Sequence, residues 1–359
     1  MPAIKVLVVD DSLFMRKLIT RLIDEDGTMK VIGSAMNGLE AVKLTKELLP
    51  DVVTMDIEMP YMNGLDALAQ IMKERPTPIV MLSSLTEDGA AATITALQHG
   101  AVDFIRKPAG SISVDLYKVK EELAGKIKAA AQSKPVRYSP VPRARMASPA
   151  GAAGSAGALQ MNQKRMIVNE IVAIGTSTGG PRALETVISS LPENFAHPIL
   201  VVQHMPPKFT YTLARRLDAS SGVRVVEAED NQLIQSGTAY IAPGDSHMKA
   251  VEINGELRIQ LSQEALRSGH RPSVDVLFES VAKLRNLKRH LVIMTGMGSD
   301  GAKGMLLAKE SGAATTIAEA EETCVVYGMP KCAVELGCVD HLLPLDRIAG
   351  KIVDVTKTH

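Results

Sequence analysis

The sequence predicts an α/β protein of two domains, each built on a mostly parallel sheet, joined by a flexible linker. The chain has 359 residues, which favours two domains over one. Short β-rich runs alternate with helical patterns in both halves, as in parallel sheets covered by helices on both faces. Between residues 134 and 165 the composition shifts to Pro, Gly, Ala and Ser, with no apolar periodicity.

The first half contains five β-rich runs separated by helical patterns. The expected strands are Lys5–Val9, Met29–Ala35, Val52–Met55, Ile79–Leu82 and Val102–Arg106. Helical periodicity covers, for example, Leu13–Asp24 and Gly38–Leu49. Five strand–helix units are the number found in a flavodoxin-like domain.

The segment between the halves carries charges of one sign. It holds six basic residues and no acidic one: Lys134, Arg137, Arg143, Arg145, Lys164 and Arg165. A nucleic-acid-binding arm is one interpretation, but no clustered basic or aromatic run supports it, so we interpret the segment as a solvated linker. The expected division is therefore 1–125 for the first domain, 126–165 for a helix end and linker, and 166–359 for the second domain.

Polar side chains follow the expected strands of the first half at their carboxyl ends. They are Asp10 and Asp11, Asp56, Ser83, and Lys107-Pro108. Carboxylates gathered at one rim repel each other unless a cation is present, and Mg²⁺ suits a few carboxylates with water and phosphate oxygens. A Lys and a hydroxyl there could hold phosphoryl oxygens, which makes Asp56 a candidate phosphoryl acceptor. Helix capping alone would explain one or two of these residues, not the set.

This set resembles the receiver domain of two-component response regulators over nearly all of residues 1–125. The match rests on the acidic pair, on Asp56 in Met55–Pro60, on Lys107-Pro108, on Ser83 in place of the commoner Thr and on Phe104 in place of the commoner Tyr. The resemblance implies phosphorylation of Asp56 and a switch formed by Ser83, Phe104 and Lys107. It also implies Mg²⁺ ligands from Asp10, Asp11, Asp56 and the backbone of Glu58.

Three apolar runs in the second half each end in a different polar residue. Val172–Ile174 leads to Ser177, Pro198–Val202 leads to His204, and His290–Met294 leads to Asp300. The ligand-facing rim of a parallel sheet lies outside the carboxyl ends of its strands, so these side chains should converge. A Ser, a His and an Asp on one rim are the inventory of a serine hydrolase.

The first of these residues lies in a turn of recognisable form. Gly175–Gly179 fits the G-x-S-x-G elbow, which exposes a serine hydroxyl between strand and helix. Gly180-Pro181 suits a helix start, and the sequence runs helically through Arg182–Leu191. A helix N-terminus there would favour a developing oxyanion, although glycine-rich turns also occur in folds that bind phosphate.

The chain order Ser, His, Asp differs from the order Ser, acid, His of the common α/β-hydrolases. The second domain is therefore expected to be a doubly wound, mostly parallel α/β hydrolase of another fold, with similar chemistry. His204 is favoured because it lies at a strand end. The alternative is His247, which is expected in a loop after a strand.

The segment around Asp300 allows a second interpretation. Gly296–Gly301 also matches G-x-G-x-x-G after a strand, with Glu319 and Glu321 at a suitable distance for a dinucleotide site. Against this, the motif falls late in the domain, and it places a carboxylate where pyrophosphate would approach. No P-loop motif is present.

Five segments of the second half resemble the catalytic domain of the bacterial chemotaxis protein-glutamate methylesterases over residues 167–355. They are Ile174–Pro181, Gln203–Thr210, Ala242–Met248, Arg271–Asp275 and Thr295–Gly301. The resemblance implies a triad of Ser177, His204 and Asp300, with oxyanion stabilisation near Thr178 and Met297. With the receiver and linker, it covers essentially the whole chain.

The family resemblance also implies substrates and partners. The substrate is a glutamate γ-methyl ester on a methyl-accepting chemotaxis receptor, with glutamine deamidation as a second activity and sensory adaptation as the outcome. A chemotaxis histidine kinase supplies the phosphoryl group. Mg²⁺ serves the receiver, and hydrolysis needs no cofactor. We expect the unphosphorylated receiver to pack over the active-site rim and phosphorylation to favour an open state.

Composition excludes several other classes. Basic and acidic residues balance at 40 each, so no global charge points to nucleic acid or a membrane. No apolar run approaches a membrane span and no signal peptide is evident. Cys324, Cys332 and Cys338 fit neither a redox pair nor a zinc site, so we expect reduced thiols in a cytoplasmic protein. A winged-helix output is disfavoured, whereas a catalytically inactive scaffold stays an alternative that serine-directed labelling would distinguish.

Overall fold

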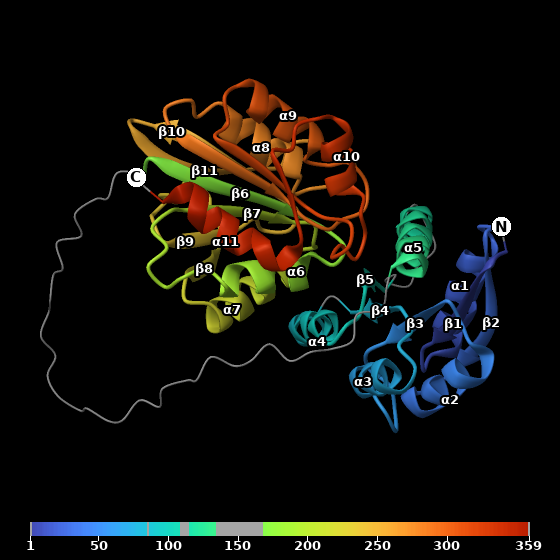
Figure 1. Cartoon of the computed structure of the whole chain (residues 1–359). Coiled ribbons are helices and arrows are strands. Elements are labelled where there is room, and N and C mark those ends of the chain that lie inside the picture. The colour runs from blue at the N-terminus through green and yellow to red at the C-terminus, as the bar shows by residue number, and fades with distance from the viewer. Residues whose placement is uncertain (1, 85, 108–114, 134–167, 358–359) are drawn as a thin grey trace, which may run out of the picture.

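The computed structural model describes residues 2–84, 86–107, 115–133 and 168–357, and it confirms the two predicted α/β domains (Figure 1). Pro108 and the predicted linker over 134–165 lie outside the described residues. The last helix of the first domain continues to Gln132, so the expected boundary at residue 125 falls within that helix.

The N-terminal domain has five parallel strands in the order β2-β1-β3-β4-β5, the flavodoxin-like order predicted from the sequence. The elements in chain order are β1 Ile4–Val9, α1 Leu13–Asp24, β2 Met29–Ala35, α2 Gly38–Leu48, β3 Val52–Asp56, α3 Gly64–Glu74, β4 Ile79–Ser83, α4 Glu87–Gln98, β5 Asp103–Arg106 and α5 Asp115–Gln132. The order reverses between β1 and β3, so Asp10 and Asp56 lie at the switch point where such sheets bind ligands.

The C-terminal domain has seven parallel strands in the order β14-β13-β12-β6-β7-β9-β8 and a separate antiparallel pair, β10-β11. The strands are β6 Glu170–Thr176, β7 Ile199–Gln203, β8 Arg224–Glu227, β9 Thr238–Ile241, β10 His247–Ile253, β11 Glu256–Ser262, β12 Lys288–Ile293, β13 Thr315–Glu319 and β14 His341–Leu343. The helices are α6 Gly180–Ser189, α7 Phe209–Ser220, α8 Val274–Ala282, α9 Ala302–Glu310, α10 Met329–Glu335 and α11 Leu345–Thr356. This arrangement confirms the doubly wound, mostly parallel prediction.

Helices cover both faces of the seven-stranded sheet, which explains why its central strands are apolar throughout rather than alternating. Val172 and Ile174 face the core under α6, α7 and α11, whereas Ile171 and Ala173 face the core under α8, α9 and α10. The two helical layers lie on opposite sides of the sheet in Figure 1. Polar side chains can therefore cluster only at the ends of the strands.

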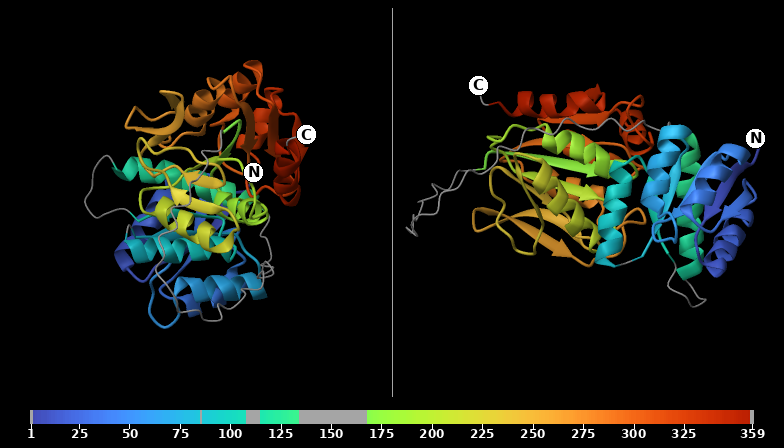
Figure 2. Two further views of the ribbon diagram at one scale, coloured as in Figure 1. Left: turned by 90° about the vertical axis from the view of Figure 1, so that its left-hand side faces the viewer. Right: turned by 90° about the horizontal axis from the view of Figure 1, so that it is seen from below.

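The two domains pack together through the side of the first domain that carries β5, α4 and α5 (Figures 1 and 2). Phe104 of β5 stacks on Phe209 of α7, with ring centroids 4.7 Å apart and planes 9° from parallel. Gln98 Nε2 donates to Glu185 Oε2 at 2.7 Å. Through Phe104, the apolar core of the first domain continues into that of the second.

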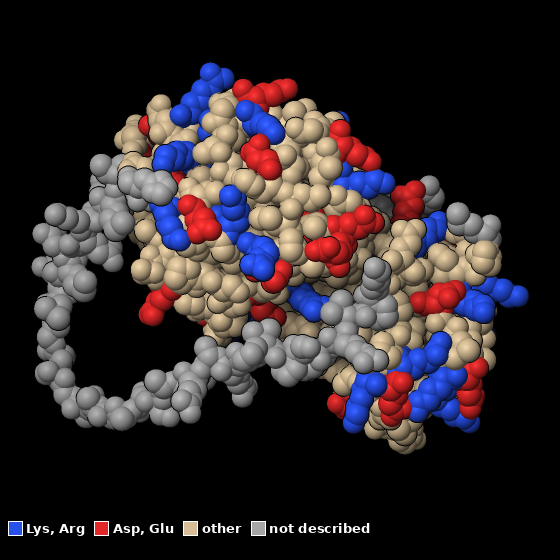
Figure 3. Space-filling model, viewed as in Figure 1, with Lys and Arg blue, Asp and Glu red and all other residues tan. Residues whose placement is uncertain are grey.

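The surface carries no large area of one charge on the face drawn in Figure 3, where basic and acidic side chains are interspersed over both domains. Within the part of the chain that the structure describes, no helix is both long enough and apolar enough to cross a membrane. Cys324, Cys332 and Cys338 are all free thiols, and Cys338 is buried.

Candidate active site and phosphorylation site

Ser177 and His204 follow neighbouring strands at the same level of the sheet. Thr176, the last residue of β6, pairs with Gln203, the last residue of β7. Gln203 Nε2 donates to the carbonyl of Ser177 at 2.9 Å, and the His204 amide donates to the carbonyl of Thr176 at 3.2 Å. The sheet register thus brings the predicted nucleophile and the predicted base together.

The turn around Ser177 depends on glycine. Gly179 has a φ of 80°, a conformation that other residues rarely adopt, and it caps α6. At Gly180, a methyl group in place of the hydrogen would overlap Gln203 Oε1. The amide of Gly180 donates to the carbonyl of Ser177 at 2.8 Å, which closes the tight strand-to-helix turn that the motif predicted.

Asp300 lies against His204, as expected for the third member of a triad. His204 Nε2 lies 2.8 Å from Asp300 Oδ2, and the two side chains are 6 % and 1 % exposed. Since an ionised carboxylate only accepts, Nε2 must carry a proton, and in the neutral ring Nδ1 is then the acceptor. Nδ1 is buried and has no hydrogen-bond partner among the described residues, so it is the ring nitrogen not engaged by Asp300. In the familiar serine-protease triad Nδ1 contacts the aspartate, whereas here Nε2 does.

Asp300 is held by the beginning of α8. Its carboxylate accepts from the Ser273 hydroxyl at 2.8 Å and from the amides of Val274 and Asp275 at 2.7 and 3.1 Å. Burial by itself would raise the pKa of Asp300, but the hydrogen bonds from His204 and the helix amides lower it to about 2. The carboxylate is therefore ionised and fixed, which suits a group that orients an imidazole.

His270 is a member of the site that the sequence did not single out. Its ring stacks on His204 with centroids 3.8 Å apart and planes 10° from parallel. Burial, reinforced by the neighbouring His204, lowers the pKa of His270 to about 4, so it is neutral at pH 7. The one available signal was its position just before the segment Arg271–Asp275.

The alternative histidine, His247, is integrated in the fold. It begins strand β10 rather than lying in a loop, and it is fully buried. Nε2 lies 3.1 Å from the carbonyl of Ala265, while Nδ1 accepts from the Ser273 amide at 3.2 Å. Both ring nitrogens are thus occupied, and neither is available to a substrate.

The two residues predicted near the oxyanion contact the N-terminal domain. Thr178, which is 4 % exposed, donates from its hydroxyl to Asp103 Oδ2 of β5. Met297, which is 38 % exposed, packs over Gly125 of α5, where an added methyl group would come within 3.2 Å of its Cε. The N-terminal domain therefore covers the rim that carries Ser177.

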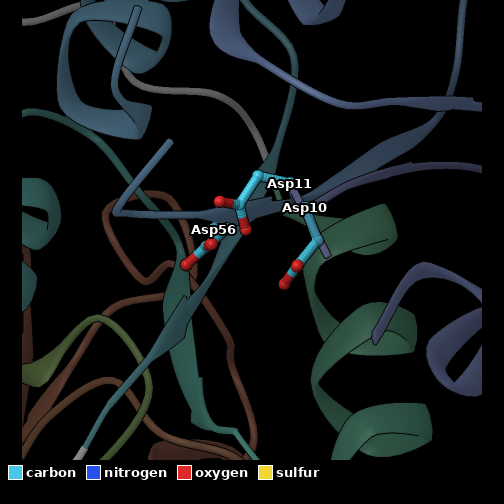
Figure 4. Close-up of side chains that lie close together, drawn as sticks. All are labelled: Asp10, Asp11 and Asp56. Carbon is cyan, nitrogen blue, oxygen red and sulfur yellow. The ribbon is translucent and has the colours of Figure 1, made fainter. Parts of the chain in front are cut away.

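The N-terminal rim brings three carboxylates together. Side-chain oxygens of Asp10, Asp11 and Asp56 all lie within 4.8 Å of one another (Figure 4). Lys107 Nζ lies 2.7 Å from Asp56 Oδ2 and 2.9 Å from Asp10 Oδ2. Burial raises the pKa of Asp56 to about 6, with a further rise from Asp10 and an opposing effect of Lys107. Clustered hard oxygen donors with excess negative charge fit Mg²⁺.

The remaining predicted residues of this rim lie in different environments. Ser83 Oγ, at the end of β4, accepts from Thr93 Oγ1 of α4 at 2.7 Å and so faces that helix. Phe104 is 4 % exposed and meets Phe209 of the other domain. The backbone amide of Glu58 donates to Asp56. The role of the Glu58 backbone as a metal ligand stays a prediction.

The dinucleotide interpretation of Gly296–Gly301 finds little support. Asp300 within the motif is bonded to His204. Glu319, the acid expected on a ribose, is fully buried and accepts instead from the Thr295 amide at 2.8 Å. Gly301, the residue just before α9, has a φ of 93° and donates its amide to the Asp275 carboxylate.

Fold and site together define a two-domain protein in which a receiver-type phosphoryl-acceptor domain packs on a domain with the side chains of a serine hydrolase. Comparison with known proteins identifies the family. The CheB methylesterase family matches residues 172–352, and the response regulator receiver domain family matches residues 6–114. The chain belongs to the CheB methylesterase family and carries a receiver domain.

Relatives support this assignment over the full length. The chain is 51 % identical over 355 residues to the protein-glutamate methylesterase/protein-glutamine glutaminase of Geobacillus kaustophilus, covering 99 % of each. It is 47 % identical to the protein of the same name from Thermotoga maritima, covering 98 % of each. The crystal structure of the Thermotoga maritima CheB methylesterase catalytic domain matches with a TM-score of 0.52 and 46 % identity, over 53 % of this chain and 100 % of that one.

Proposed function

We propose that this protein hydrolyses glutamate γ-methyl esters on methyl-accepting chemotaxis receptors, and that it deamidates glutamine side chains there, as part of sensory adaptation. The full-length similarity to proteins named for both activities supports the choice of substrate. The observation that carries the chemistry is the contact of His204 with Asp300 on the strand-end rim beside Ser177.

In the proposed reaction, Ser177 Oγ attacks the ester carbonyl while His204 Nδ1 takes the hydroxyl proton. Asp300 keeps the other proton on Nε2 and stabilises the imidazolium that forms. The proton on Nδ1 then passes to the leaving oxygen, and methanol departs. Water, deprotonated at the same nitrogen, hydrolyses the acyl-enzyme to a glutamate carboxylate and restores Ser177. With a glutamine substrate the leaving group is ammonia.

Two residues beside the nucleophile would stabilise the oxyanion. Thr178 is the first residue after Ser177, in the turn that begins α6, where the helix N-terminus favours negative charge. Met297 belongs to the loop after β12 whose Gly296 packs directly on Ser177.

The receiver would regulate access to this site. Asp56 is the proposed phosphoryl acceptor, with Mg²⁺ held by Asp10, Asp11, Asp56 and the Glu58 backbone. When bound, the cation would neutralise charge on the phosphoryl oxygens. Lys107 would pair with those oxygens, and Ser83 would turn toward them and release Thr93 of α4. Since α4 packs on α6 and α7, such a change would reach the domain interface that now covers Thr178 and Met297.

The partners and boundaries follow from this assignment. A chemotaxis histidine kinase would supply the phosphoryl group, and the cytoplasmic helices of the receptors would supply the substrate, which places the protein in the cytoplasm without membrane insertion or nucleic acid. The proposed units are the receiver at 1–125, a helix end and linker at 126–165, and the catalytic domain at 166–359.

The direct test is methanol release from methylated receptor membranes by the full chain, with and without a small-molecule phosphodonor and Mg²⁺. We expect release that rises with the donor and disappears in Ser177→Ala, which should keep the thermal stability of the wild type. A serine-directed fluorophosphonate should label Ser177. A Ser177→Ala protein that keeps most of the wild-type turnover would refute the assignment of Ser177 as nucleophile. Absence of labelling in the wild type would favour a catalytically inactive scaffold.

A further inference from the structure

One buried acid beside the active site has no part in the proposed reaction. Glu319 ends β13 and is fully buried. One oxygen, Oε2, accepts from the Thr295 amide at 2.8 Å. The other, Oε1, is also buried and accepts no hydrogen bond of normal geometry from the described residues. Burial raises the pKa of this carboxyl, and the hydrogen bond from the Thr295 amide is the largest opposing effect, ahead of weaker effects of Thr323, Cys324 and Arg182.

Such a group is unfavourable in a core unless something offsets its desolvation. An apolar side chain of the same size would fill the position without an unsatisfied oxygen. The hydrogen bond from the Thr295 amide to Glu319 is therefore the feature to explain. Thr295 is the residue that joins the two halves of the active site.

Thr295 connects the nucleophile turn to the loop of Met297. Its carbonyl accepts from the Ser177 amide at 3.0 Å, and its hydroxyl donates to the carbonyl of Thr178 at 2.9 Å. The next residue, Gly296, packs so closely on Ser177 that an added methyl group would lie 2.8 Å from the Ser177 Cβ. Any shift of the Thr295 backbone thus moves Ser177 and the oxyanion loop relative to each other.

We propose that Glu319 is a positioning residue for ester hydrolysis: its carboxylate fixes the Thr295 backbone and so sets the spacing between the Ser177 hydroxyl and the loop of Met297. The inference rests on the proposed function of Ser177 as nucleophile. Because the spacing matters most when the tetrahedral oxyanion forms, loss of the hydrogen bond should lower kcat and leave KM nearly unchanged.

The test compares three variants of Glu319 in the full chain, activated by a phosphodonor and Mg²⁺. Glu319→Met keeps the size and removes the acceptor, and kcat should fall about tenfold or more. Glu319→Gln keeps an acceptor at the same reach and should stay within about threefold of the wild type. Glu319→Asp withdraws the carboxylate by one methylene and should behave like Glu319→Met, which provides a second variant if Met prevents folding.

The matched control lies at the opposite end of the same strand. Asp340 Oδ2 accepts from the amide of Thr316 at 2.9 Å, away from Ser177. Asp340→Leu removes this amide hydrogen bond together with the one from the Thr316 hydroxyl and the ion pair with Lys309, so it should lower thermal stability but leave kcat unchanged. An equal loss of kcat in this control and in Glu319→Met would mean that general loosening of the sheet is responsible, which overturns the proposal.

The rate of Ser177 labelling by a fluorophosphonate separates this inference from the substrate assignment. Slower labelling in Glu319→Met, restored in Glu319→Gln, supports the proposal whether or not the wild type releases methanol. A wild type that labels but releases none contradicts the ester substrate alone. Unchanged labelling and kcat in folded Glu319→Met or Glu319→Asp overturns the positioning role.

Discussion

Asp56 and Asp300 occupy similar places in the two domains, yet the pKa values of their carboxyl groups are shifted in opposite directions. Each is buried at or beyond the carboxyl end of a central parallel strand. The pKa of Asp56 is raised to about 6, because burial and Asp10 outweigh the contact with Lys107. The pKa of Asp300 is lowered to about 2, because burial is outweighed by hydrogen bonds from His204 and from the beginning of α8.

The difference lies in the donors that each sheet edge provides. Asp300 receives a hydroxyl, two helix amides and an imidazole, so its charge is fully satisfied and fixed. Asp56 shares one lysine with a second acid and lies beside a third. Under the proposed function, the satisfied carboxylate of Asp300 suits a group that orients its neighbour, and the less satisfied one of Asp56 suits a group that binds a cation and accepts a phosphoryl group.

The strongest test of this contrast is Asp300→Asn. The variant keeps the shape but loses the charge that holds the His204 tautomer, so kcat for methanol release should fall roughly 10⁴-fold. Asp346→Asn is the control, because the Asp346 side chain is 74 % exposed, and it should leave kcat unchanged. Activity within tenfold of the wild type would show that Asp300 does not orient the base.

Asp56→Asn should remove the response to the phosphodonor and should also stabilise the folded chain. Asp56 holds its proton up to pH about 6, whereas the unfolded side chain loses it near 3.8. The folded state therefore binds more protons in that window, and stability falls as pH rises through it. At pH 7 the variant should gain up to about 3 kcal/mol, and the gain should vanish below pH 4.

Denaturant unfolding of both Asn variants across pH measures the two carboxylates against each other. Asp300→Asn should change stability in the opposite direction and lose about 2 kcal/mol at pH 7, since its native charge is stabilising at any pH above about 4. Equal signs for the two variants would contradict the contrast.

Asp103→Ala tests the proposal that the receiver suppresses the other site. Asp103 accepts from Thr178 beside the nucleophile, so its loss should weaken the covered state and raise basal methanol release on the order of fivefold. Activity with the phosphodonor should change little. A catalytic fragment of residues 166–359 sets the upper limit, and a fragment no more active than the unphosphorylated full chain would argue against inhibition by the receiver.

Phe209→Leu should produce the smallest effect. It removes the stacking on Phe104 but keeps an apolar contact, so basal activity should rise about two- to threefold. The basal rate is the readout, and the distant Phe195→Leu is the control. A larger effect than that of Asp103→Ala would mean that aromatic packing, rather than the Thr178 contact, holds the domains together.

Sequence patterns were sufficient for the fold and for most of the site because both depend on local chain properties. The predicted strands Met29–Ala35 and Val52–Met55 agree with β2 and β3 to within one residue. Parallel strands expose their carboxyl ends at one rim, so the residues following them had to converge. By the same reasoning Ser177, His204 and Asp300 could be grouped before any contact was known.

Tertiary structure decided what depends on contacts between segments far apart in the chain. In the folded protein His270 stacks on His204, and both ring nitrogens of His247 form hydrogen bonds. Ser83 accepts a hydrogen bond from Thr93, and Asp103 accepts one from Thr178. Tertiary structure also determined which nitrogen of His204 contacts Asp300. Periodicity and spacing describe one segment at a time, whereas these features arise only when separate segments exclude water from each other and must satisfy their polar groups together.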